Sequence, residues 1–196
     1  LLAMLTLLFA AIITLRHDAS GAPVTAFNDM FIRDRMGDLL KLFAYGTLGL
    51  VFIYAKHYLR TFGMFRADFF TLSLFALLGV MLLISSNNMV LLYLGLELTS
   101  LSSYALVAFD RDSGRGSESA MKYFVLSSMA SGLLLYGMSM VYGATGSLSL
   151  PEIAAAVAAQ EQVGLLLALG LVFLIVGIAF KLGAAPFHMW LPDVYD

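Results

Sequence analysis

Three ionisable residues, Glu97, Lys122 and Lys181, lie inside stretches that otherwise read as membrane-spanning. A charge in the hydrocarbon of a bilayer costs at least about 2.5–3.5 kcal/mol, so such a residue indicates a functional site. Carboxylate and ammonium groups both take up and release protons. The three residues are therefore the candidates for proton translocation.

Glu97 lies eight residues after Met89 and twelve before Phe109. At about 1.5 Å per residue it is roughly 12 Å and 18 Å from the ends of this stretch, close to the bilayer centre. Hydroxyl residues follow it and suggest a helix face that meets other helices or water; they are Thr99, Ser100, Ser102 and Ser103. The alternative is a protonated, hydrogen-bonded glutamate with a structural role only.

Lys181 is followed at once by two helix-breaking residues, Gly183 and Pro186. Residues 163–191 would span about 44 Å as one helix, which is longer than the hydrocarbon core. We therefore predict one crossing made of two pieces, broken between Leu182 and Pro186, with Lys181 near its middle. Backbone freed by such a break is tolerated where it lines a wet cavity. The alternative is a lysine that ends a helix near the interface.

Lys122 lies about five residues into its apolar stretch, so its long side chain can reach back to the membrane surface. Glu118, four residues earlier, lies on the same helix face and could pair with it. An anchoring role and a titrating role for Lys122 are both open.

A lysine releases protons near neutral pH only if its pKa falls well below the ordinary value of about 10.4. Burial of an ammonium group lowers its pKa, and a nearby carboxylate raises it. At an effective dielectric constant of about 20, retreat of a carboxylate from about 4 to 8 Å removes about 2 kcal/mol of attraction. A buried lysine–glutamate pair with a variable gap can thus switch proton affinity.

The elements that carry these residues are apolar helices. The chain has 196 residues, of which 61% are hydrophobic and 12% charged, and its mean hydropathy is +0.90. This composition predicts a polytopic all-α membrane protein. The expected crossings form a single membrane domain over residues 1–196, and they are 1–15, 39–55, 69–85, 89–109, 117–142 and 163–191. We further expect a short surface helix that starts near Pro151, and a chain that is a fragment of a longer protein.

Several classes of partner and cofactor are not expected. The chain has no cysteine, which excludes iron–sulfur ligation and covalent haem attachment. Its histidines, His17, His57 and His188, are scattered, so we expect no metal site. A net charge of −2 makes nucleic acid an unexpected partner.

The loop charges predict an orientation. Side X is the face reached by residues 16–35, 87–88 and 143–162, and side Y is the opposite face. On side X, Arg16, Arg33 and Arg35 are diluted over a long first connection, and the other two connections have no Lys or Arg. Side Y carries a compact set of basic residues: Lys56, Arg60, Arg66, Arg111 and Arg115. The positive-inside rule therefore makes side Y the cytoplasmic candidate.

Four strings resemble one family. They are LGLELTSLSSY at 94–104, ESAMKYF at 118–124, YGATGS at 142–147 and FKLGAAPFHMWLPDVY at 180–195. They are similar to the antiporter-like membrane subunits of bacterial NADH–quinone oxidoreductase (respiratory complex I), and the ending PDVY favours the subunit N branch. The resemblance implies a bundle of about fourteen spans with two inverted repeats and broken helices.

By this resemblance, Glu97 is the glutamate that pairs with the lysine of the broken helix, Lys181, and Lys122 is the lysine of the span between them. The resemblance implies a subunit of the bacterial inner membrane that translocates protons beside other membrane subunits. NADH, flavin, iron–sulfur clusters and quinone would be bound by other subunits. A multisubunit Na⁺/H⁺ antiporter subunit and a purely structural membrane subunit are the alternatives.

Overall fold

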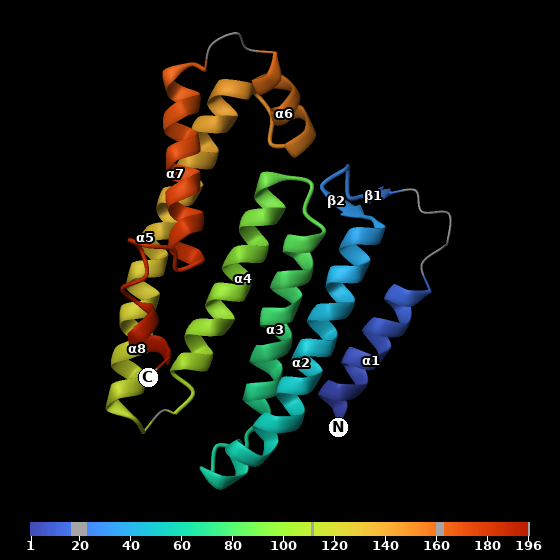
Figure 1. The fold of residues 1–196 in the computed structure, drawn as a ribbon, viewed down its shortest axis with the longest axis vertical. Coiled ribbons are helices and arrows are strands. Elements are labelled where there is room, and N and C mark those ends of the chain that lie inside the picture. Colours follow the sequence, from blue (N-terminus) through green and yellow to red (C-terminus); the bar gives the residue numbers. More distant parts are fainter. Residues whose placement is uncertain (17–22, 111, 160–162, 196) are drawn as a thin grey trace.

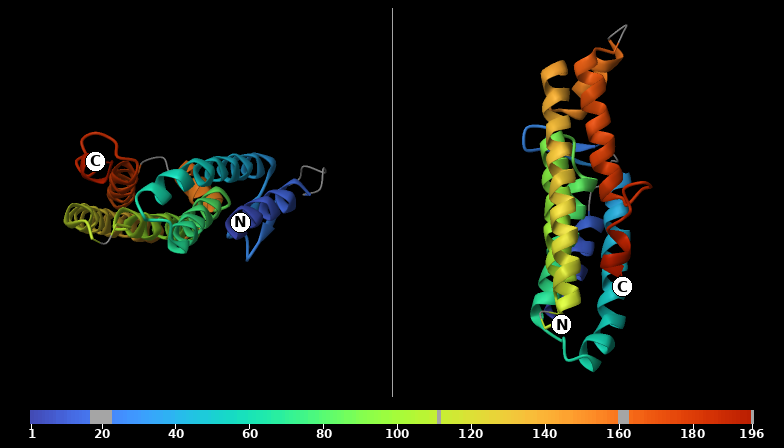
Figure 2. Two further views of the ribbon diagram at one scale, coloured as in Figure 1. Left: turned by 90° about the horizontal axis from the view of Figure 1, so that it is seen from below. Right: turned by 90° about the vertical axis from the view of Figure 1, so that its left-hand side faces the viewer.

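The helices stand nearly side by side in a flat bundle, which is thin when viewed along its edge (Figures 1 and 2). The computed structural model describes residues 1–16, 23–110, 112–159 and 163–195. The helices are α1 (Leu2–Leu15), α2 (Arg35–Thr61), α3 (Ala67–Ile84), α4 (Met89–Val107), α5 (Gly114–Thr145), α6 (Leu150–Ala158), α7 (Leu165–Lys181) and α8 (Leu191–Tyr195). The strands are β1 (Val24–Ala26) and β2 (Phe31–Arg33).

Membrane-spanning capacity differs among the helices. Among the described residues, α2, α3, α4 and α5 are long and apolar enough to cross a bilayer, whereas α1, with 14 residues, and α7, with 17, are apolar but shorter. Large apolar side chains such as Phe43, Leu50 and Ile175 are exposed, as lipid-facing side chains are. The all-α membrane fold is confirmed, and the count of six crossings stays a prediction.

The helix ends follow local sequence signals. Asp34 caps α2 by accepting a hydrogen bond from the Gly37 amide at 2.7 Å, and Asn88 caps α4 through the Val90 amide at 2.9 Å. Pro151 lies in the first turn of α6, so the predicted short helix is present. Helix α2 runs beyond the apolar stretch 39–55 at both ends, from the Asp34 cap to Thr61.

A small β-hairpin in the first connection was not expected. Strands β1 and β2 pair antiparallel around Phe27, Asn28 and Asp29, which all have positive φ. Without glycine or proline, these turn residues give little signal in a sequence, although Asn and Asp tolerate this conformation. The hairpin covers the turn between α3 and α4, where the Ile32 amide donates to the Ser85 carbonyl at 2.8 Å.

Glycines allow two pairs of helices to approach closely, α3 with α4 and α5 with α7. A Cβ atom added to Gly95 would lie 2.9 Å from the Gly79 carbonyl oxygen of α3. A Cβ atom added to Gly137 would lie 2.8 Å from the Gly170 carbonyl oxygen of α7. Small residues at such interfaces let backbones pack without intervening side chains.

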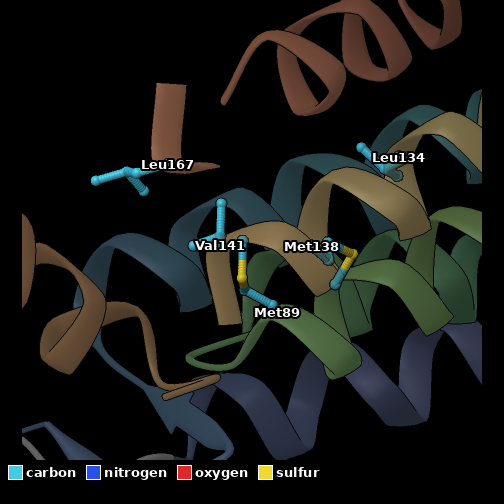
Figure 3. Packing of buried hydrophobic residues seen from close by; sticks show 5 residues of the cluster. All are labelled: Met89, Leu134, Met138, Val141 and Leu167. Atoms are coloured by element: carbon cyan, nitrogen blue, oxygen red, sulfur yellow. The ribbon is translucent and has the colours of Figure 1, made fainter. Parts of the chain in front are cut away.

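Two hydrophobic clusters fill the bundle. One joins α4, α5 and α7 through Met89, Leu134, Met138, Val141 and Leu167 (Figure 3). The other joins α1, α2 and α3 and is formed by Leu7, Tyr45, Phe52 and Leu77. The first cluster lies on the side-X half of α5 and α7, so it fixes the helices that carry Glu97 and Lys181.

The predicted helix break follows Lys181. Helix α7 ends there, and α8 begins at Leu191, so both lie along α5 as separate pieces (Figure 1). Gly183 has φ +64°, in the left-handed region that ends helices. The break begins at Leu182 as expected, but it extends to Trp190 and not only to Pro186. The reason is that two short turns, closed by the Phe187 and Leu191 amides, separate the helices.

Candidate functional site

Lys181 and Glu97 meet inside the bundle, although they are 84 residues apart in the sequence. The Lys181 Nζ donates to Glu97 Oε1 at 3.1 Å and to Ser100 Oγ at 2.8 Å. The Ser131 hydroxyl donates to the same glutamate oxygen. The side chains of Lys181 and Glu97 are 8% and 22% exposed. The site therefore draws one residue from α7, one from α5 and two from α4.

The break after α7 positions the lysine. Lys181 is the last residue of α7, so a regular helix precedes it and no helical turn follows it. The Trp190 Nε1 donates to the Phe180 carbonyl at 3.2 Å, and its ring stacks on Tyr123 of α5 at 4.5 Å. Trp190 thereby ties the returning chain to both α7 and α5.

Serine hydroxyl groups complete the hydrogen bonding of the Lys181–Glu97 ion pair. Ser100 lies three residues after Glu97 on the same face of α4. Ser100 and Ser131 are 6% and 4% exposed, so their hydroxyls are sheltered from lipid and solvent. Buried ions are stable only when they are paired and hydrogen-bonded. The serines supply bonds that a bare ion pair would lack.

The arrangement can exchange protons. Both partners are titratable, and the distance between them sets the attraction that holds a proton on the ammonium. At an effective dielectric constant of about 20, separation from about 4 to 8 Å changes that attraction by about 2 kcal/mol.

Lys122 lies apart from this pair. Its Nζ is 2.9 Å from Glu118 Oε1 and 3.4 Å from Asp193 Oδ2 of α8, and its side chain is about half exposed. The expected pairing with Glu118 is present, and Asp193 is an unpredicted second partner.

Sequence reasoning missed an ionic cluster where β2 meets the start of α2. Arg33 Nε donates to both oxygens of Asp38 at 3.1 Å, and Lys41 Nζ lies 3.8 Å from Asp38 Oδ1. Asp38 and Lys41 are 9% and 5% exposed. The Arg33 Nη2 also donates to the Thr14 carbonyl of α1 at 3.0 Å. Lys41 lies within the predicted crossing 39–55, which was the signal available for finding it.

Metal-binding groups do not gather in the described part of the chain. No set of three His, Cys, Asp or Glu residues there is arranged to hold an ion. His57 and His188 are exposed and separate, while His17 and Arg111 lie outside the described residues.

Apolar helices that hold a buried lysine–glutamate pair at a helix break define an antiporter-like membrane protein. The chain belongs to the family described as "NADH:quinone oxidoreductase/Mrp antiporter, TM", which matches residues 86–196. With its apolar helices, this places it in the bacterial inner membrane.

Relatives support the same family. The chain is 54% identical over 194 residues to NADH-quinone oxidoreductase subunit N of Thiobacillus denitrificans, covering 99% of this chain and 40% of the relative. It is 35% identical to a chain of respiratory complex I from Thermus thermophilus with bound aureothin, with a TM-score of 0.75. The match covers 98% of this chain and 40% of that chain. It shares the fold of a chain of the Mrp complex from Dietzia sp. DQ12-45-1b, at 22% identity and a TM-score of 0.78. The match covers 99% of this chain and 38% of that chain. The chain spans about two fifths of the length of these relatives.

Proposed function

We propose that this chain is part of the proton-translocating, antiporter-like subunit N of an NADH–quinone oxidoreductase. The observation that carries the proposal is the buried Lys181–Glu97 ion pair beside a helix break. Subunit N relatives that match nearly the whole chain support it. In this role the subunit moves protons while other subunits pass electrons from NADH to quinone.

The pair supplies the proton-handling step. Lys181 holds a proton while Glu97 is close and ionised, and it releases the proton when the carboxylate withdraws. Flavin, iron–sulfur clusters and quinone belong to other subunits in this proposal, and other membrane subunits are its partners. The complex is the enzyme, and this chain is its non-redox, translocating part.

A Na⁺/H⁺ antiporter subunit is the second candidate function, favoured by the shared fold with the Mrp complex chain. Purification in a complex with flavin and iron–sulfur proteins supports the respiratory function. Isolation with small membrane partners alone supports the antiporter. A purely structural subunit, with a permanently charged pair, is the third possibility.

Substitution of Lys181 by arginine distinguishes a lysine that releases protons from a lysine with a structural role only. Arginine keeps the positive charge but its pKa stays above about 12, so it cannot release a proton in each cycle. We expect Lys181→Arg in the full-length subunit to assemble and pump poorly, and Lys181→Ala to do similar or worse damage. The measurement is proton uptake per electron pair in liposomes, with a blue-native gel for assembly.

Lys56→Arg is the matched control, because Lys56 is exposed near the side-Y end of α2. This variant should pump like the parent. If Lys181→Arg pumps like the parent, Lys181 does not release a proton in each cycle, and a purely structural role is favoured.

A further inference from the structure

A groove runs between α1 and α3, and α1 lies at one edge of the flat bundle (Figure 1). Two adjoining cavities of about 990 Å³ and 370 Å³ form the groove, and Thr6, Thr71 and Leu74 line both of them. Phe75 and Leu78 line its deeper part and are 47% and 44% exposed, so the groove is open to the outside of the bundle. A molecule in the bilayer can therefore enter the groove from the side.

The walls of this groove are apolar over a length that suits an acyl chain. Met81 lies eleven residues after Phe70 on α3, which is roughly 16 Å along the helix axis. This length is about half of the hydrocarbon core of a bilayer, and thus the depth of one leaflet. The hydroxyls of Thr6 and Thr71 donate to carbonyl groups of their own helices, so they present little polarity to the groove.

Two basic residues, Lys56 and Arg60, line the side-Y end of the groove. Together with Phe52 they lie four residues apart on one face of α2. Phe52 is 3% exposed and also lines the groove, whereas both cations are exposed. The wall that α2 contributes therefore changes from apolar to positively charged toward side Y.

The charges of Lys56 and Arg60 are available to a ligand. Within the described part of the chain, no carboxylate lies within ion-pair distance of either residue. The Arg60 guanidinium lies over the ring of Phe65 at 5.1 Å, a contact that leaves its N–H groups free to bind an anion.

We propose that this groove binds an anionic phospholipid of the side-Y leaflet. Its phosphate lies at Lys56 and Arg60, and one acyl chain lies between α1 and α3. Arginine and lysine are common phosphate ligands, and basic pockets between membrane helices bind anionic lipid headgroups. The site is separate from the Lys181–Glu97 pair, so it goes beyond the proposed function and does not depend on it.

Photolabelling in the assembled complex tests the site. The probe is phosphatidylglycerol that carries a diazirine at the end of one acyl chain, present in small amount in phosphatidylcholine vesicles that contain the complex with the full-length subunit. After irradiation, labelled residues are mapped by mass spectrometry. We expect labels on the groove residues of α1 and α3, such as Leu7, Leu74 and Leu78. Excess phosphatidylglycerol should remove these labels, whereas added phosphatidylcholine or inorganic phosphate should not.

Substitutions at the side-Y end test the headgroup contact. Lys56→Gln and Arg60→Gln should each need about fivefold more probe for the same labelling, because a basic residue near a membrane surface contributes about 1 kcal/mol to the binding of anionic lipid. Lys56→Arg keeps the charge and should be labelled like the parent. Arg66→Gln is the matched control, because Arg66 is exposed at side Y but lines a different pocket.

Four results would overturn the inference. They are equal labelling by a phosphatidylcholine probe with the same diazirine, unchanged labelling in both Lys56→Gln and Arg60→Gln, and displacement of the probe by inorganic phosphate, which would mean that the cations hold a free anion. The fourth is labelling elsewhere on the subunit but not in the groove, which would mean that another subunit covers it. A blue-native gel checks assembly of the variants, and the competition experiment on the parent needs no variant. None of these readouts uses proton pumping, so failure of the lipid site leaves the proposed function standing.

Discussion

At the scale of single residues, the described part of the chain concentrates its buried charge in two places. One is the Lys181–Glu97 pair, and the other is the cluster of Arg33, Asp38 and Lys41. The first is held by serine hydroxyls and adjoins a helix break, which fits the proposed proton-handling role. The second joins the hairpin, α1 and α2 through direct contacts, which fits a structural role.

Glu97→Gln tests the carboxylate partner. Glutamine keeps the shape of glutamate and can accept the same hydrogen bonds, but it lacks the charge that sets proton affinity. We expect normal membrane assembly with reduced proton pumping, measured in sealed vesicles. Glu152→Gln on the exposed part of α6 should pump like the parent, and wild-type stoichiometry in Glu97→Gln would refute the assignment.

Asp38→Asn tests the structural cluster. The change leaves two cations, Arg33 and Lys41, without their shared carboxylate, and breaking a buried ion pair costs about 3–5 kcal/mol. We expect less assembled complex on a blue-native gel and a lower midpoint of thermal unfolding. Asp68→Asn at the exposed start of α3 is the control, and an equally small loss in both variants would contradict this role.

At the scale of elements, helix α7 and its break were accessible from sequence because Gly183 and Pro186 interrupt a long apolar run. The pairing of Glu97 with Lys181 was implied by the family resemblance. The roles of Ser100, Ser131 and Trp190 were not accessible, because they depend on the rotation of α4, α5 and α7 about their axes. The hairpin and its partner residues on α2 were missed since three-residue strands leave almost no periodic pattern.

Gly95→Ala tests the close contact between α3 and α4. The added Cβ atom would lie 2.9 Å from both the Gly79 carbonyl oxygen and the Leu83 amide nitrogen, so the helices must separate. Overpacking of this kind costs about 1–3 kcal/mol. We expect a lower unfolding midpoint and weaker pumping, because Glu97 lies two residues further along α4.

Gly132→Ala is the control for Gly95→Ala, because an added Cβ atom there has no contact within 4 Å. Alanine also favours helix at exposed positions, so this variant should be as stable as the parent or more stable. Equal unfolding midpoints for the two variants would show that the α3–α4 contact is looser than the structure indicates.

At the scale of the whole molecule, the chain spans about two fifths of the length of the subunit N relatives that it matches. Inverted repeats in such proteins carry equivalent broken helices. We expect the full-length chain to contain a second apolar helix interrupted by glycine or proline, with a lysine near its break. The full sequence and structure check this, and a remainder without such a helix would contradict the repeat architecture.

The side-X connections share a feature that the side-Y connections lack in the described part of the chain. The turn between α3 and α4 bonds to the hairpin through the Asn87 amide and to the α5–α6 connection through the Met89 amide, both at 2.9 Å. The backbone bonds of the described side-Y turns are all local. Backbone hydrogen bonds thus join the connections at the side-X end of the bundle. Any tilt of the α5–α7 pair against the α3–α4 pair must therefore pivot about the side-X end. The displacement of the helices grows toward the side-Y end. The largest displacement is therefore expected there, at the open pocket that Ser103, Ser119 and Asp193 line.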